Sequence, residues 1–251
     1  MFGNVIYFDE DKIATYTTSI TGKPLVKSQL VERSTNKAAS IGLSSVKAEG
    51  GSANTYSVKS TDSILNEINE FEKKLRNRDD FFDFSTNPNY YLENIHRGNI
   101  VKFNTYISVP EMFDIIQTVE KFKPLMTSQV KSSMQKDEAD AFQAFFDAQN
   151  AKIPVMCAIE DTEVRALIET NYLAIPYEEI EEYEEIEMSV LARTLDNSLV
   201  KKDKPFYEPL KHFIKLNRTI RRSMANDVQN ELSPIYSDDD YRLIEILAIY
   251  G

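Results

Sequence analysis

Glycine is missing from residues 99–250, and the whole chain of 251 residues has only seven. Because glycine lacks a Cβ atom, it lets the backbone turn sharply or approach a ligand closely. Phosphate-binding loops, dinucleotide fingerprints and nucleophile elbows all need it at fixed spacings. None of the seven glycines matches those spacings. The sequence therefore excludes these sites, and the turns after residue 98 have to rely on Asn, Asp and Pro.

The composition predicts a globular protein with a substantial core and an acidic surface. Hydrophobic residues make up 42% of the chain, including 14 Phe and 13 Tyr. The formal net charge of −11 argues against attraction of the whole protein to nucleic acid or to an anionic membrane, since both need positive potential. The charge leaves a basic protein partner open.

A single cysteine, Cys157, excludes an internal disulfide and any zinc site built from several cysteines. It lies in the apolar run Ile153–Ile159, which favours a buried core thiol over a reactive one. No apolar run is long enough to cross a bilayer, which takes about 18–20 residues, and the early acidic residues Asp9–Asp11 do not fit a signal peptide. We therefore expect a cytoplasmic protein with no membrane partner.

Residues 1–94 are predicted to form a unit of one strand and two helices. Val5–Phe8 is typical of a strand, and Asp9 is a good N-cap for a helix that ends at Gly22. Residues 23–60 are rich in Ser, Thr, Ala, Asn and Gly and predict a long flexible loop. Asp62 or Ser63 is then expected to cap an amphipathic helix.

Residues 95–251 are predicted to form an α+β core domain. The alternation of apolar residues predicts five strands, over Asn99–Ser108, Ile153–Glu160, Glu163–Glu169, Glu185–Thr194 and Tyr241–Tyr250. The second and third of these are expected to form a hairpin. Helical spacing predicts three helices, over Pro110–Phe122, Asp137–Asn150 and Phe206–Met224. The fold class is therefore α+β, with a mostly antiparallel or mixed sheet and flanking amphipathic helices.

Asp9 and Asp11, directly after the first predicted strand, are the strongest candidates for catalysis. Two aspartates separated by one residue at this place resemble the motif of haloacid-dehalogenase-type phosphatases, which implies Mg²⁺ binding and attack on phosphorus. Lys12 and Ile13 depart from the small residues expected to follow, and a late glycine-aspartate loop is missing. The alternative is that Asp9 caps a helix and Asp11 lies in its first turn, where negative charge suits the helix dipole.

The chain also separates its charges into an acidic run and a basic stripe. Seven glutamates fall within ten positions: Glu178, Glu179, Glu181, Glu182, Glu184, Glu185 and Glu187. They could attract a basic partner or mimic a phosphate backbone, or they could form a solvated face or neutralise basic residues of the same chain. On the last predicted helix four basic residues follow helical spacing: Lys211, Lys215, Arg218 and Arg222. They could bind phosphates, or they could be the wet face of an amphipathic helix.

The remaining polar candidates do not suggest a metal site. His96 and His212 lie in distant segments with no ligand spacing around them. The acidic triplet Asp238–Asp240 lacks the glycine and the spacing of a calcium loop. We therefore expect neither a metal nor another cofactor.

Short stretches at both ends of the chain carry a family resemblance. Val5–Asp9, followed by Lys12, Ile13 and Tyr16, and the closing Ile246–Tyr250 resemble an uncharacterised bacterial family known only as a domain of unknown function. A piece like Glu185–Arg193 followed by a charged helix also resembles it. The resemblance implies a bacterial, cytoplasmic α+β protein and brings no catalytic residues with it. Proteins of this kind often lie beside mobile-element or phage-defence genes, so the resemblance also implies a role there.

Three functions follow as expectations. The first is a non-enzymatic binding or regulatory component of a bacterial assembly, with a protein partner and a possible homo-oligomer. The second is a Mg²⁺-dependent phosphohydrolase that uses Asp9 and Asp11. The third is a nucleotide or nucleic-acid sensor that uses the basic helix within residues 206–222, although the net charge disfavours nucleic acid.

Overall fold

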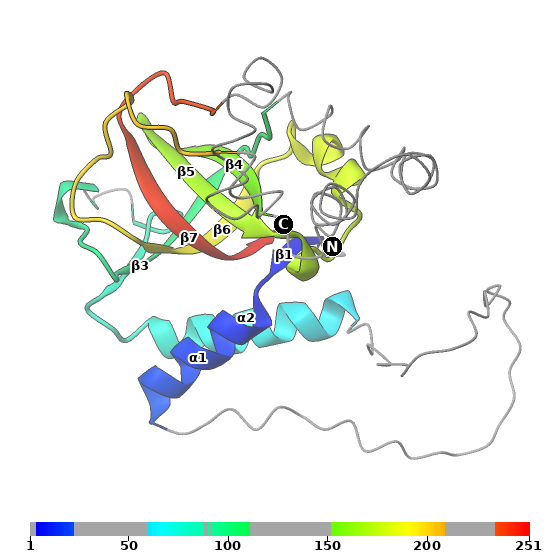
Figure 1. The fold of residues 1–251 in the computed structure, drawn as a ribbon. Helices are drawn as coiled ribbons and strands as arrows, with labels where there is room; N and C mark the ends of the chain where they lie inside the picture. The colour runs from blue at the N-terminus through cyan, green and yellow to red at the C-terminus, as the bar shows by residue number, and fades with distance from the viewer. Residues whose placement is uncertain (1–3, 23–59, 88–89, 91, 111–151, 209–233) are drawn as a thin grey trace, which may run out of the picture.

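The computed structural model describes residues 4–22, 60–87, 90, 92–110, 152–208 and 234–251. Within them the fold is α+β, with two helices and a seven-stranded mixed sheet (Figure 1). The helices are α1 (Glu10–Thr21) and α2 (Thr61–Leu75). The strands are β1 (Val5–Phe8), β2 (Phe81–Asp83), β3 (Ile100–Thr105), β4 (Lys152–Ile159), β5 (Thr162–Glu169), β6 (Met188–Thr194) and β7 (Tyr241–Tyr250). Three short 3₁₀ helices are η1 (Leu92–Asn94), η2 (Thr170–Tyr172) and η3 (Tyr177–Tyr183).

The sheet is mostly antiparallel and is organised around β7. Its strand order is β2-β3-β6-β7-β5-β4, with β1 paired to the end of β7. Only β2–β3 and β5–β7 are parallel pairs. Because β7 is ten residues long, its first half pairs with β5 and its last residues pair with β1, on the edge that faces away from β6. Strand β7 is thus the element that joins the sheet together.

The sheet curls until β4 meets the segment that follows β3. Ser108 and Met156 exchange two backbone hydrogen bonds of 2.9 Å, and the amide N–H of Ala158 donates to the Thr105 hydroxyl at 3.3 Å. Pro154, in the same strand, has no N–H to offer. The outer edge of β4 is therefore largely satisfied within the chain, as an edge strand must be to avoid pairing with other chains.

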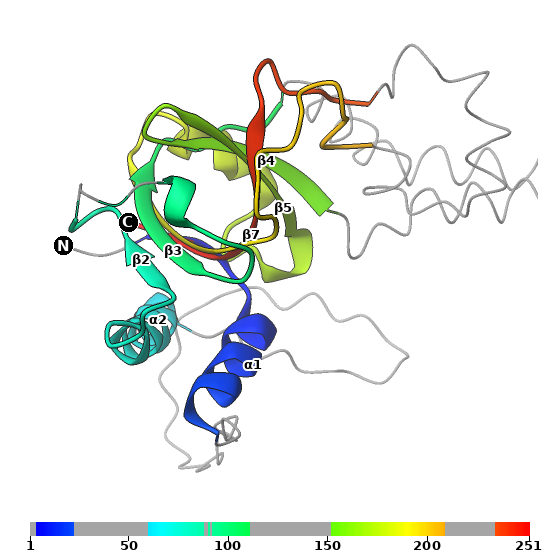
Figure 2. The same cartoon turned by 90° about the vertical axis from the view of Figure 1, so that its left-hand side faces the viewer.

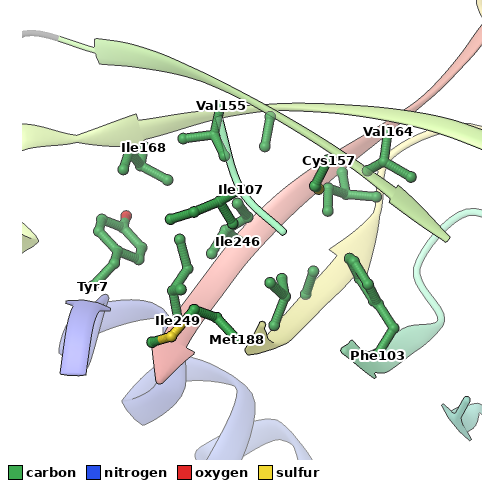
Figure 3. Packing of buried hydrophobic residues seen from close by; sticks show 14 of the residues in the cluster. Tyr7, Phe103, Ile107, Val155, Cys157, Val164, Ile168, Met188, Ile246 and Ile249 are labelled. Atoms are coloured by element: carbon green, nitrogen blue, oxygen red, sulfur yellow. The ribbon is translucent and has the colours of Figure 1, made fainter. Parts of the chain in front are cut away.

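Two hydrophobic clusters cover the two faces of the sheet. The inner cluster fills the curl, and the side chains of Ile107, Val155 and Ile246 point toward one another there (Figure 3). The outer cluster joins α1 and α2 to the other face of the sheet through residues such as Ile13 of α1 and Phe71 of α2. Both views show the two helices on the same side of the curled sheet (Figures 1 and 2). The apolar sides of both helices thus pack against the sheet.

The predicted strands β1 and β7, and the hairpin of β4 with β5, are confirmed. The prediction that Asp9 caps α1 and Gly22 ends it is also confirmed, with Gly22 in the left-handed conformation at φ +66°. The predicted cap of the second helix was wrong. Ser60, not Asp62 or Ser63, is the N-cap, because Ser60 is the extended residue whose hydroxyl accepts a hydrogen bond from the Ser63 amide at 3.3 Å.

Two predicted boundaries in the C-terminal part were also wrong. Strand β6 begins at Met188 rather than Glu185, because the Ile186 amide donates to the Tyr183 carbonyl in a turn. The last predicted helix cannot begin at Phe206, whose amide pairs with the Ile235 carbonyl at 3.0 Å in a bridged segment. The strand predicted over Asn99–Ser108 is shorter, since its pairing with β6 ends at Thr105.

Several predictions lie outside the described residues: the helices over Pro110–Phe122 and Asp137–Asn150, the rest of the helix over Phe206–Met224, and the loop over 23–60 apart from its last residue. The division into residues 1–94 and 95–251 stays a prediction. Strands β1 and β2 come from the first part and pair with β7 and β3 of the second, so the sheet spans both.

Candidate functional site

The Asp9 carboxylate is buried at the N-terminus of α1 and has three partners. It accepts a hydrogen bond from the Lys12 amide at 3.0 Å and from the Tyr7 hydroxyl at 3.2 Å. The Lys12 ammonium lies 2.5 Å from its Oδ2 atom. The Asp9 residue is only 1% exposed. A carboxylate that attacks a phosphate ester has to be reached by the substrate, so these contacts are those of a helix cap and not of a nucleophile.

Asp11 is engaged separately from Asp9. Its Oδ2 atom accepts a hydrogen bond from the Tyr172 hydroxyl at 2.7 Å. That hydrogen bond, together with burial, raises the pKa of Tyr172 well above its usual value, so the hydroxyl stays a neutral donor. Within the described residues no three His, Cys, Asp or Glu side chains are grouped in a way that could bind a metal ion. The two aspartates therefore connect α1 to its neighbours.

A chain of polar contacts continues from Lys12 along the inner side of α1. Lys12 lies 3.7 Å from Glu245 of β7, and Glu245 accepts a hydrogen bond from the Tyr16 hydroxyl at 2.5 Å. The Arg193 guanidinium of β6 donates to the same hydroxyl at 3.1 Å and stacks over the Tyr16 ring. Sequence reasoning missed these contacts. The available signal was the presence of charged residues inside two mostly apolar strands, Arg193 in β6 and Glu245 in β7.

A second buried polar cluster joins α2 to the sheet, and we name it the Glu72 cluster (Glu72, Lys102 and Tyr250). The Lys102 ammonium donates to both Glu72 oxygens, at 2.9 and 2.8 Å, and the Tyr250 hydroxyl donates to one of them. Burial, and then the Glu72 charge, raise the pKa of Tyr250 far above its usual value. All three groups are satisfied by one another, so the Glu72 cluster is a structural connection rather than a free reactive site.

Cys157 lies in the inner hydrophobic cluster, as expected. Burial raises the pKa of its thiol from 9.0 to about 12. Because the thiolate is the nucleophilic form, the folded protein at pH 8 contains almost none of it.

We therefore expect Cys157 to resist alkylation in the native protein at pH 8 and to react at the rate of a free thiol in denaturant. Mass spectrometry after timed iodoacetamide treatment measures both rates. Equal rates in the two conditions would contradict burial of the thiol.

The acidic segment, residues 177–187, is an exposed charged feature of the described residues. Its first part is the 3₁₀ helix η3, whose period of three residues places Ile180 in the core and Tyr183 half buried. Five of its glutamates are exposed: Glu179, Glu181, Glu182, Glu185 and Glu187. The side chain of Glu178 lies outside what the structure describes. Glu184 differs from the others, because it accepts a hydrogen bond from the Val109 amide at 2.9 Å.

This bond and the β3–β6 pairing hold the acidic segment beside residues 105–109. Thr105 pairs with Met188 at one end, and Val109 contacts Glu184 at the other. Between these two contacts lie two large apolar side chains that face solvent, Tyr106 at 60% exposure and Ile186 at 44%. An exposed apolar pair rimmed by charge is typical of a protein-binding surface.

The other predicted site residues divide into two groups. The basic residues Lys211, Lys215, Arg218 and Arg222, with His212, lie outside the described residues. His96 is exposed in a turn. Asp240 forms an ion pair with Lys201 at 2.6 Å, which fits a charge cluster in a loop.

Neither helix of the described part is long and apolar enough to span a bilayer.

Comparison with known proteins gives one match. The family model described as a domain of unknown function, DUF6414, matches residues 4–250. No curated protein and no solved structure matches the chain.

Proposed function

The chain belongs to the DUF6414 family, a family defined without an activity, and from its own surface we propose that it is a non-enzymatic binding or regulatory component of a bacterial assembly. The observation that carries this proposal is the acidic segment. Its exposed glutamates are presented on a 3₁₀ helix and turn that Ile180 anchors in the core.

The charge of this surface is available to a partner. Glu179, Glu182, Glu185 and Glu187 form no ion pair with the part of the chain that the structure describes. A concentration of negative charge attracts a positively charged partner, accelerates its association and suppresses wrong partners. The expected partner is therefore a protein with a basic surface segment.

The two alternative functions have less support. A phosphohydrolase of this kind needs an accessible nucleophile, whereas Asp9 is buried and held by Lys12 and Tyr7. The residues proposed for a nucleotide or nucleic-acid sensor lie outside the described part. Binding through the acidic segment is the function that the geometry supports best.

We expect a variant with Glu179, Glu182, Glu185 and Glu187 changed to Gln to lose its partner. The immobilised native chain would be used to capture proteins from the native host, and a captured protein would be purified for affinity measurements. Its affinity should fall with added salt, because exposed charges are screened, and should be at least about tenfold weaker for the variant.

The matched control removes four exposed acidic charges elsewhere: Glu160, Asp161, Asp238 and Asp239, changed to Gln or Asn. This control should bind like the native chain. Equal binding by both variants, or no captured protein at all, would contradict the proposal.

A further inference from the structure

We propose that the partner docks with an apolar side chain on Tyr106 and Ile186 while its basic residues face the surrounding glutamates. This inference rests on the proposed function and adds the chemistry of the partner, which is a segment that alternates basic and apolar residues. Tyr106 and Ile186 together form what we name the apolar patch.

The backbone brings the two residues of the apolar patch near each other, because Thr105, next to Tyr106, pairs with Met188, two residues after Ile186. The β3–β6 register pairs Asn104 with Ser189, and their side chains are hydrogen bonded at 2.9 Å on the exposed face. Tyr106 follows two residues after Asn104 and therefore continues along the same face. The backbone of Ile186 is held by its N–H, which donates a hydrogen bond to the Tyr183 carbonyl at 3.1 Å.

The exposure of the apolar patch is unusual for this protein. Only four large hydrophobic side chains among the described residues are exposed, and Tyr106 is the most exposed of them. The other two, Leu199 and Tyr236, lie in different segments: Leu199 has no acidic neighbour within two residues, whereas Tyr236 lies shortly before the aspartates Asp238–Asp240. Tyrosine is enriched at the centres of interfaces, because its ring buries a large area at little entropic cost.

Charge complementarity selects the occupant. Glu185 and Glu187 flank Ile186 directly, and both are exposed. An uncharged apolar partner would leave these carboxylates desolvated without a counter-ion, which is unfavourable. A segment with Lys or Arg on either side of an apolar residue satisfies both the carboxylates and the patch. A second copy of this acidic chain would instead bring like charges together if it docked through the same face.

The test uses two labelled ten-residue peptides of equal positive charge, one alternating Lys with Leu and the other alternating Lys with Ser. Fluorescence anisotropy gives the affinity of each for the full chain. We expect the Lys–Leu peptide to bind at least about tenfold more tightly. The variant Tyr106→Ser/Ile186→Ser should abolish that difference and leave binding of the Lys–Ser peptide unchanged. The matched variant Leu199→Ser/Tyr236→Ser should behave like the native chain.

The outcomes separate the two proposals. Equal affinities for the two peptides, with salt-dependent binding that the Glu→Gln variant loses, would overturn the apolar docking and leave the proposed function standing. No binding of either peptide would count against both. Self-association of the native chain in sedimentation experiments, lost in Tyr106→Ser/Ile186→Ser, would show that a second copy is the occupant and would overturn the proposed partner. Because both replaced residues are exposed, circular dichroism should show an unchanged fold.

Discussion

Replacing Glu72 by Gln is expected to lower the free energy of unfolding by ~3–5 kcal/mol, because breaking a buried ion pair leaves an uncompensated charge. The Lys102 ammonium donates to both Glu72 oxygens and is largely buried between α2 and β3. Gln offers it only one neutral acceptor. Urea denaturation followed by circular dichroism measures the effect.

Two variants show whether the effect belongs to the Glu72 cluster. Glu70→Gln, two residues earlier in α2, removes the exposed pair with Lys73 and should change stability little, since exposed pairs contribute little. The double variant Glu72→Gln/Lys102→Met removes both buried charges and should recover most of the loss. A Glu72→Gln protein as stable as Glu70→Gln would show that the Glu72 cluster does not stabilise the fold.

Replacing Asp9 by Ala is expected to cost ~2–4 kcal/mol. Loss of an N-cap costs about 1 kcal/mol, and the buried Tyr7 hydroxyl, left without its acceptor, costs a further ~1–3 kcal/mol. Burial and the Asp9 charge raise the pKa of Tyr7 far above its usual value. The hydroxyl therefore stays protonated and needs an acceptor for its hydrogen. Thermal and urea denaturation give the change.

Asp9→Asn should lose less than Asp9→Ala, because the amide oxygen can still accept from the Lys12 amide. Asp62→Ala, an exposed acidic residue in the first turn of α2 that is not a cap, is the matched control and should have a small effect. The assignment of Asp9 as a structural cap would not survive if Asp9→Ala were as stable as Asp62→Ala.

Local chemistry explains which parts of the fold could be predicted. The helix N-cap at Asp9, the end of α1 at Gly22 and the alternation in Tyr241–Tyr250 each depend on a few neighbouring residues. One error was local, and another came from a contact with a distant segment. The Asp62 prediction missed that Ser60 is already positioned to cap the helix, and the helix predicted from Phe206 missed its pairing with Ile235.

The candidate sites divide in the same way. The run of glutamates was visible in the sequence, and so was the period of three that places Ile180 inside η3. Its neighbour across the surface, Tyr106, could not be found, because β3 and β6 are separated by more than 80 residues and only their pairing brings them together. The role of Asp9 was likewise left open until Tyr7 and Lys12 were found on its carboxylate.

By itself the sequence determined the fold class, the buried thiol and the absence of glycine-dependent loops after residue 98, because composition, periodicity and the lack of a Cβ atom act locally. Tertiary structure alone decided that β7 joins the sheet, that Glu72 meets Lys102, and that Tyr106 lies beside the acidic segment. These last features arise from strand pairing and packing between distant residues, and no local pattern specifies which strands will meet.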